Sequence, residues 1–431
     1  MRVLLLAATS SYRTDAFVAA AKKLGAEAIV GSDRCHVLDG ILDFTDGSLA
    51  LDLRHAEIAA QQIVNGLVDR PVDAIVPTND QTAHVAALAA RALGLAANPP
   101  DAAYRARNKR RMRESLRAAG VDCPRFVCAP MQIDADDLMH AVEGSVGFPC
   151  VLKPLLLSGS RGVMRADDRD SLRGALARLR AILEIPEQRP TADDDPDSAQ
   201  ILVEEFIPGA EVAVEGLLAD GRFFPLAIFD KPDPLDGPFF EETIYVTPSR
   251  HPAETQAAIV EATARAARAM GLVCGPVHAE LRLPPAGPPS VIEVAARTIG
   301  GLCGRTLRFS LGESQAGDDE SATLEELVVG LALGTFREPP SRSKGASGVM
   351  MLPIPQGGVL RSVEGEDRAR AVPGIVDLAV TARPGERLVP LPEGASYLGF
   401  LFARGETPAA VEASLRAAHG ELRFEIAPLL T

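Results

Sequence analysis

The chain has 431 residues, of which 47% are hydrophobic, and a formal net charge of -14 at pH 7. This length and apolar content allow a large buried core, divided among about two to four domains. The acidic balance excludes the basic surface stripe on which nucleic-acid binding depends, so small molecules are the expected ligands. No segment approaches the roughly 20 apolar residues of a membrane span, and the N-terminus lacks the long apolar core of a signal peptide. A cytoplasmic protein without a membrane partner is therefore expected.

The cysteines are scattered along the chain, without a C-x-x-C pair or a companion cluster of histidines. This spacing favours reduced structural thiols and gives no zinc site. The cysteines are Cys35, Cys123, Cys128, Cys150, Cys274 and Cys303.

The N-terminal part of the chain alternates short apolar runs with helical stretches. Strands are expected at 2–8, 28–30 and 73–77, and helices at 14–24 and 53–67. This rhythm predicts βαβ units that feed a parallel sheet, as in a Rossmann-like domain. The turn after the first strand lacks the G-x-G-x-x-G motif, so we assign no dinucleotide and expect a structural or substrate-facing role.

The pattern changes after Pro100. A basic amphipathic helix is expected over 108–119. Further on, a strand ending at Lys153-Pro154 leads into a glycine-serine loop, after which another strand begins at Val163. The acidic stretch 185–200 has too few apolar residues to pack, which predicts a mobile surface loop.

The C-terminal part predicts a small α+β unit that begins after about residue 335. It has two hairpin-like segments, a helix over 407–419 and a last strand over 422–426. The expected division of the chain is 1–100, 101–335 and 336–431.

The strongest chemical signal is a pair of acidic strands, VHAELRL and SVIEVAAR, joined by a proline-rich turn. If the turn is centred on Ala286 and Gly287, antiparallel pairing places Glu280 directly across from Glu293. Facing carboxylates repel, so a cation is expected between them.

Two interpretations of this acidic pair are open. Arg282 and Arg297 share the face of the glutamates by the period-2 alternation of a strand, which indicates a charge ladder. The alternative is a divalent metal ion held by hard oxygen ligands.

A second signal is the loop Leu-Leu-Ser-Gly-Ser-Arg-Gly, which ends at Gly162 and follows a strand that carries Lys153. Small residues let backbone N–H groups approach phosphate oxygens, and the lysine supplies a charge. The loop is not a P-loop, because Val163 follows Gly162. Taken alone, an ordinary hairpin turn is the favoured interpretation.

A third signal is an apolar strand that ends in Glu204 and Glu205 and continues into a turn before Glu211. Adjacent carboxylates are common at a solvated strand end. Here, however, they lie between the glycine-serine loop and the acidic strands, where a nucleotide base and ribose would need hydrogen-bonding groups.

In this order and spacing the motifs resemble the ATP-grasp ligases, most closely the L-amino-acid ligase branch that makes dipeptides. The resemblance runs from the Rossmann-like domain through Lys109, Lys153-Pro154, the Ser-Gly loop and Glu-Glu-Phe-Ile to the acidic strands. It implies a multidomain α/β and α+β fold: an N-terminal pre-ATP-grasp domain, a central ATP-grasp domain with its nucleotide site between two subdomains, and a C-terminal α+β cap.

The resemblance also implies an activity. The protein would be an ATP-dependent, carbon–nitrogen bond-forming ligase that activates a carboxylate as an acyl phosphate and joins it to an amine. Amino acids are the implied substrates, and ADP and phosphate the implied by-products. The implied cofactors are ATP and Mg²⁺, with Mn²⁺ as an alternative, and the implied assembly is a homodimer.

Nucleotide contacts follow from the resemblance residue by residue. Lys109 and Lys153 would contact the phosphates, and Glu204 would accept a hydrogen bond from the adenine amino group. Glu211 would bind the ribose hydroxyls. The lid over the phosphates and the lining of the base would be formed by Ser158, Gly159, Ser160, Gly162, Glu205, Phe206 and Ile207.

Metal and catalytic roles follow in the same way. Glu280 and Glu293 would hold magnesium, and Arg297 would stabilise the transferred phosphoryl group and the oxyanion of the tetrahedral intermediate. His278 matches a histidine that often precedes the first metal ligand, although a packed strand histidine is an equal alternative. Glu242 lies in a proline-rich acidic loop and could pair with the α-ammonium group of a substrate. Tyr245, in the same segment, stands where relatives can have a catalytic histidine. The alternative for this segment is a solvated connection without a role in catalysis.

One position departs from the family pattern. Ala295 stands where most ATP-grasp enzymes have an asparagine that completes the metal shell, which leaves the coordination of a second magnesium open. Two other functions stay open beside the ligase: an ATP-grasp carboxylase or purine-pathway ligase, and a nucleotide-binding sensor without turnover.

Overall fold

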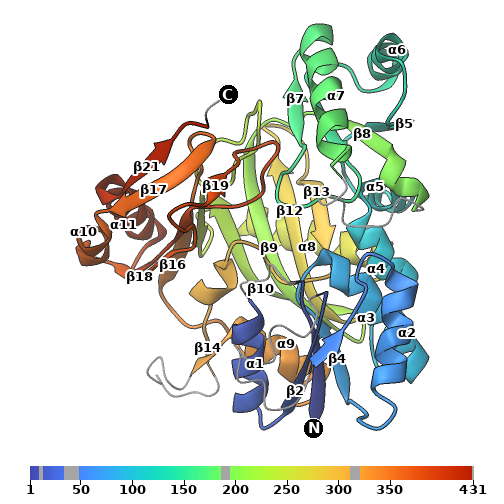
Figure 1. The fold of residues 1–431 in the computed structure, drawn as a ribbon, viewed down its shortest axis with the longest axis vertical. Coiled ribbons are helices and arrows are strands. Elements are labelled where there is room, and N and C mark those ends of the chain that lie inside the picture. Colours follow the sequence, from blue (N-terminus) through green and yellow to red (C-terminus); the bar gives the residue numbers. More distant parts are fainter. Residues whose placement is uncertain (9–12, 34–47, 186–194, 311–320, 430–431) are drawn as a thin grey trace.

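The computed structural model describes residues 1–8, 13–33, 48–185, 195–310 and 321–429. Figure 1 shows three parts around a central sheet: the N-terminal domain at the bottom, a small lobe at the top and the C-terminal part at the left. Cys35 and most of the acidic stretch predicted as a surface loop lie outside the described residues.

The N-terminal domain is built on a parallel sheet in the order β3-β2-β1-β4, which confirms the predicted βαβ units. Alternate side chains of the first strand face opposite layers: Val3 and Leu5 pack with the first helix, and Leu4 and Leu6 pack with the next two. The elements are β1 (Arg2–Leu6), α1 (Thr14–Lys23), β2 (Glu27–Ser32), β3 (Ser48–Ala50), α2 (Ala56–Gly66), β4 (Ala74–Pro77) and α3 (Asp80–Leu93).

The small lobe is an antiparallel sheet in the order β5-β8-β6-β7, with two helices packed on one face. Its strand with Lys153 ends at Pro154, as predicted, and the next strand begins at Met164, one residue later than expected. The lobe contains β5 (Phe126–Pro130), α6 (Ala135–Ser145), β6 (Cys150–Pro154), β7 (Met164–Ala166), α7 (Arg169–Leu183), η2 (Pro196–Ala199) and β8 (Gln200–Glu205).

The central sheet has eight strands in the order β13-β12-β9-β10-β11-β16-β20-β18. Three helices cover one face; the predicted helix 108–119 is among them and is capped at its start by Asn108. These elements are α4 (Pro100–Arg107), α5 (Lys109–Ala118), β9 (Ala210–Ala219), β10 (Arg222–Lys231), β11 (Ile244–Thr247), α8 (Ala253–Met270), β12 (Gly275–Leu283) and β13 (Ser290–Ala295).

The C-terminal part does not stand apart from this sheet. Its strand β16 pairs with β11, Tyr245 lying opposite Val349, so three strands of the expected cap extend the central sheet. The helix and strand predicted at the C-terminus are present within one or two residues. The remaining elements are η3 (Cys303–Thr306), β14 (Phe309–Ser310), β15 (Ser321–Ala322), α9 (Leu324–Ala332), β16 (Ala346–Leu352), β17 (Gly358–Glu364), α10 (Glu366–Ala371), β18 (Ile375–Val380), β19 (Arg387–Leu388), β20 (Gly399–Gly405), α11 (Pro408–Glu421) and β21 (Arg423–Ala427).

None of the helices in the described ranges is long and apolar enough to cross a membrane. The five described cysteines, Cys123, Cys128, Cys150, Cys274 and Cys303, form no disulfide with one another, in agreement with the expected reduced thiols.

The acidic strands pair as predicted. Glu280 lies directly opposite Glu293 in the antiparallel register of β12 and β13. A register shift follows between Glu280 and Leu281, so the pairing toward the turn is offset by one residue.

The segment that joins the lobe to β9 is fixed by one glycine. Gly209 has a φ of +108°, and a Cβ added there would lie 2.0 Å from the carbonyl oxygen of Leu283. Gly287, in the turn between β12 and β13, has a φ of +104° but no heavy atom within 4 Å of the same position. The two glycines therefore share the backbone constraint and differ in the space around them.

We predict that Gly209→Ala lowers the free energy of unfolding by roughly 2 to 4 kcal/mol, because the strain of a positive φ is added to a clash with backbone. Gly287→Ala, the matched control, should cost only about 1 kcal/mol. Thermal denaturation of the two variants compares these effects. Equal losses of melting temperature would show that the close approach to the carbonyl oxygen of Leu283 does not add to the cost of the substitution.

Candidate active site

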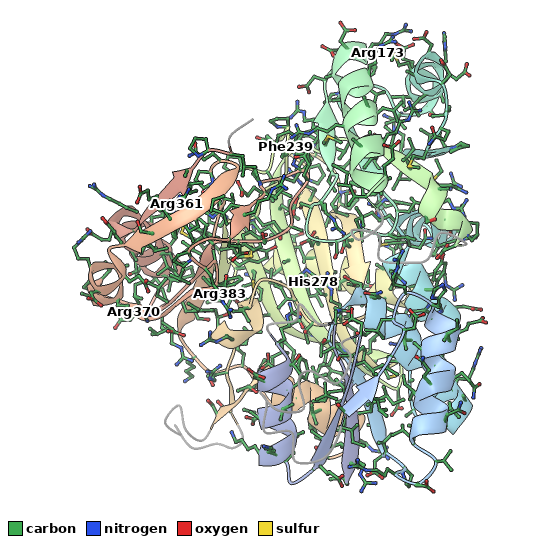
Figure 2. The ribbon with its side chains drawn as sticks, in the orientation of Figure 1. Arg173, Phe239, His278, Arg361, Arg370 and Arg383 are labelled. Atoms are coloured by element: carbon green, nitrogen blue, oxygen red, sulfur yellow. The ribbon has the colours of Figure 1, made fainter. Side chains whose placement is uncertain are left out.

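The residues predicted for the site meet in one cavity of about 640 Å³. The N-terminal domain, the lobe, the central sheet and the C-terminal part all contribute to its wall. Figure 2 shows one of the lining residues, His278, on the central sheet near the middle of the molecule. Every residue predicted for the site lines the cavity except Gly162.

Lys153 and Glu204 form a buried ion pair on neighbouring strands of the lobe. Nζ of Lys153 lies 2.6 Å from Oε2 of Glu204, and Nε of Arg113 lies 2.7 Å from Oε1. Burial alone would raise the pKa of Glu204, but the two cations outweigh it and lower that pKa. Glu204 thus holds Lys153 at the cavity wall; its contact with an adenine amino group remains a prediction.

Lys109 approaches the same wall from the start of α5. Its Nζ donates to the carbonyl oxygen of Leu157 at 2.6 Å and lies 3.9 Å from Oε2 of Glu293. The two lysines predicted to contact phosphates therefore flank the segment where the Ser-Gly loop begins.

The Ser-Gly loop lies against the C-terminal part. The backbone N–H of Gly162 donates to the carbonyl oxygen of Pro392 at 2.8 Å, and a Cβ on Gly159 would lie 3.3 Å from the Cβ of Ala395. A guanidinium supports the contact, because Arg178 pairs with Glu393. The loop predicted as a lid therefore lines the cavity and is docked on the C-terminal part in this structure.

The wall predicted for the nucleotide base centres on Phe206. The guanidinium groups of Arg165 and Arg282 lie 4.3 Å and 5.3 Å from its ring centroid. Both oxygens of Glu211 are engaged, one by Nζ of Lys231 and the other by Nε of Arg282, each at 2.7 Å. Glu205 is held by Arg125 at the lobe edge. Ion pairs thus fix these carboxylates before a ligand arrives.

Lys231 is the centre of an acidic cluster. Its ammonium lies 2.7 Å from Glu211, 2.6 Å from Glu242 and 2.9 Å from Glu280. The lysine side chain is only 3% exposed, and the three carboxylates raise its pKa well above the usual value. Lys231 is therefore a permanent cation beneath three glutamates of the cavity wall.

The pKa values of the glutamates diverge within this cluster. Burial raises the pKa of Glu242 to about 7, although Lys231 acts in the opposite direction. Burial would also raise the pKa of Glu280, but Lys231 and His278 hold it well below the usual value. Of Glu242 and Glu280, Glu280 is the carboxylate that stays ionised at neutral pH.

His278 and Tyr245 are packed side chains rather than exposed ones. The ring of His278 lies 3.6 Å from Glu215 and 3.5 Å from Glu280, and these carboxylates raise its pKa although burial acts against them. Burial, with Glu242 nearby, raises the pKa of Tyr245 well above its usual value. Both residues line the cavity, and neither catalytic role is tested by this geometry.

Arg297 lies between the acidic strands and the N-terminal domain and contacts both. Its Nη2 lies 3.7 Å from Oε1 of Glu293, and its Nε lies 2.9 Å from Oδ2 of Asp80. Although burial acts to lower the pKa of Arg297, Asp80 and Glu293 raise it. The guanidinium is therefore a fixed charge between the acidic hairpin and the N-terminal domain.

The donor set fits a magnesium ion. Glu280 and Glu293 face each other with carboxylate oxygens, the ligands that this hard cation prefers. Ligand atoms of Glu211, Glu242 and Glu280 lie within 4.8 Å of one another, but the ammonium of Lys231 already serves as the cation of that cluster. Glu293 keeps its cationic neighbours at 3.7 Å and 3.9 Å, beyond direct hydrogen-bond distance.

Three residues of the site had no role assigned from the sequence. Lys231 ends an apolar strand and Lys153 is the next-to-last residue of another, and that similar pattern could have identified Lys231. Asp80 and Arg13 come from the N-terminal domain, far away in the chain, and no local pattern links them to Arg297.

Three family models match the chain in order. An ATP-grasp N-terminal domain matches residues 18–96, an ATP-grasp domain matches 146–306, and an L-amino acid ligase C-terminal domain 2 matches 350–427.

Among known proteins, alanine–anticapsin ligase of Bacillus subtilis (strain 168) is 31% identical over 256 residues, 57% of this chain and 52% of that protein. Carnosine synthase 1 of Gallus gallus is 29% identical over 344 residues, 77% of this chain and 35% of that protein. The match thus spans about half or less of the length of these curated relatives.

A solved structure agrees over the whole chain. The L-amino acid ligase from Bacillus licheniformis superposes with a TM-score of 0.82 and 26% identity, covering 99% of both chains. The chain therefore belongs to the ATP-grasp family, in its L-amino acid ligase branch.

Proposed function

We propose that the protein is an ATP-dependent ligase that joins the carboxylate of one amino acid to the amine of another. One observation carries the proposal: the facing glutamates Glu280 and Glu293 share a cavity with Lys109, Lys153 and Arg297. This arrangement combines oxygen ligands for a metal with three cations suited to phosphate. Family membership and the names of the relatives support amino-acid substrates.

The reaction requires two bond exchanges. An oxygen of the substrate carboxylate attacks the γ-phosphorus of ATP, and the bond to the bridging oxygen of ADP breaks. The amine nitrogen then attacks the acyl carbon, phosphate leaves, and the nitrogen loses a proton. Both transition states concentrate negative charge on oxygen, so positioning and electrostatic stabilisation dominate catalysis.

Different residues of the chain serve these two steps. Lys109 and Lys153 hold the phosphates, and Arg297 faces the transferred phosphoryl group and later the oxyanion. Glu280 and Glu293 would hold magnesium, which, when bound, neutralises charge on the phosphates. The ionised form of Glu242 pairs with the α-ammonium group of a substrate. The Ser-Gly loop shields the acyl phosphate from water.

Assembly and location remain predictions: a homodimer in the cytoplasm. The number of magnesium ions is also a prediction. Ala295 is buried opposite His278, so the second acidic strand supplies only Glu293 to the metal shell.

The first experiment is magnesium-dependent ADP release with the proteinogenic amino acids, singly and in pairs, with mass spectrometry of the products. Turnover that needs a particular pair and yields its dipeptide would establish the ligase. ADP release that depends on bicarbonate would instead identify a carboxylase. Binding of ATP without release in any mixture would identify a nucleotide sensor.

Glu293→Gln should lower kcat at least about a hundredfold, because the neutral amide weakens the metal site and the electrostatic stabilisation that depends on it. Glu143→Gln is the matched control, since it removes a surface carboxylate paired with Arg169 on the lobe. Mn²⁺ titration followed by electron paramagnetic resonance should show weaker binding only in the first variant. Unchanged Mn²⁺ affinity would remove Glu293 from the metal site.

Lys231→Met should destabilise the protein by roughly 3 kcal/mol near pH 8, because it removes the cation that contacts the partly buried carboxylates of Glu242 and Glu280. In the variant, the folded-state pKa values of Glu242 and Glu280 rise above their unfolded values. The destabilisation is therefore present when they are ionised and shrinks as the pH falls through the raised pKa values.

Thermal melts of wild type and variant between about pH 8 and pH 6 measure this pH dependence. The matched control is Lys23→Met, which removes an ammonium that is 49% exposed and pairs with the carboxylate of Glu326. A melting-temperature difference for Lys231→Met that stays constant with pH would contradict the proposed charge balance.

A further inference from the structure

The N-terminal domain reaches into the cavity at the carboxyl end of β4. Thr78, Asn79 and Asp80 line the wall there. Asn79 caps α3 in a reciprocal capping box with Thr82, which fixes the first turn of the helix. Asp80 is the first residue of that helix, so the local fold defines where its carboxylate points.

The carboxylate of Asp80 meets the guanidinium of Arg297 in a direct contact between domains. Oδ2 accepts from Nε at 2.9 Å, while Nη1 donates to the carbonyl oxygen of Thr298 at 3.1 Å. Burial would raise the pKa of Asp80, yet Arg297 lowers it, so the carboxylate is ionised. The two contacts fix the plane of the guanidinium and leave its Nη2 on the side of Glu293.

A second tether from the N-terminal domain holds the backbone that follows. Arg13 donates through Nη1 to Oγ1 of Thr298 at 2.9 Å, and through Nη2 to the carbonyl oxygen of Ile299. From the central sheet, the carboxylate of Glu215 accepts from the backbone N–H of Ile299 at 2.9 Å. The segment that leads from Arg297 to Gly300 on the cavity wall is thus clamped from both sides.

We propose that Asp80 is a positioning residue, which orients Arg297 toward the terminal phosphate of the nucleotide, with Arg13 aligning the adjoining backbone. This inference rests on the proposed role of Arg297 at the transferred phosphoryl group. An arginine has many rotamers, and a charged acceptor at Nε selects one before the ligand arrives. The N-terminal domain, which has no dinucleotide motif, thereby acquires a function in phosphoryl transfer.

Nucleotide binding tests the proposal without requiring turnover. The dissociation constants of MgADP and of magnesium AMP-PNP are measured by calorimetry for wild type, Asp80→Ala and Asp80→Asn. Wild type should bind AMP-PNP more tightly than ADP. Asp80→Ala should reduce the affinity for AMP-PNP about tenfold and leave that for ADP unchanged. The AMP-PNP affinity of Asp80→Asn, which retains an oxygen acceptor, should lie between those of wild type and Asp80→Ala.

Two further variants separate positioning from general damage. Glu326→Gln removes another ion pair between the N-terminal domain and the rest of the chain, that with Lys23 at 3.0 Å, and should change neither affinity. In the background of Arg297→Ala, the further change Asp80→Ala should have no effect, because a positioning residue acts through its partner.

Three results would overturn the inference. The first is a ratio of the AMP-PNP and ADP affinities that Asp80→Ala leaves unchanged. The second is a loss of AMP-PNP affinity on Asp80→Ala that is equally large in the Arg297→Ala background. The third is a wild type that does not bind AMP-PNP more tightly than ADP. Wild type that shows the expected binding pattern but joins no pair of amino acids would refute the ligase proposal alone. Wild type that binds neither nucleotide would refute both.

Discussion

Two glutamates that face each other on adjacent strands repel, and the site is organised around that repulsion. Glu280 is balanced by Lys231 and His278, and Glu293 lies near Lys109 and Arg297. These side chains come from β10, β12, the start of α5 and the segment after β13, so the charge balance can form only when these parts of the chain are assembled together. Burial of unpaired carboxylates would be far more costly than this network.

The sequence was sufficient to predict what depends on local pattern. Alternation and turn position placed Glu280 opposite Glu293, and the rhythm of apolar runs gave the parallel N-terminal sheet. The order of motifs indicated the family, and sixteen of the seventeen residues predicted for the site line one cavity.

Long-range pairing could not be predicted in this way. The sequence offered Arg282 and Arg297 as cations for the acidic strands, whereas Lys231 makes the short contact with Glu280. Glu204 was assigned to the base, yet it is engaged by Arg113, a residue of α5 some 90 positions earlier in the chain. Partners of this kind are chosen by tertiary packing, because a buried charge takes whichever opposite charge the fold brings within reach.

The continuity of the central sheet determines which parts of the molecule can move. Because β11 pairs with β16, the wall contributed by the C-terminal part and the acidic strands belong to one hydrogen-bonded unit. Relative motion between them would break a ladder of backbone hydrogen bonds. The lobe, by contrast, joins the rest through two chain crossings, before β5 and after β8, and touches the C-terminal part through the Ser-Gly loop and Arg178. Rotation of the lobe about Phe206–Gly209 and its companion crossing would therefore separate it from Pro392 and Glu393, while the ladder between β11 and β16 stays intact.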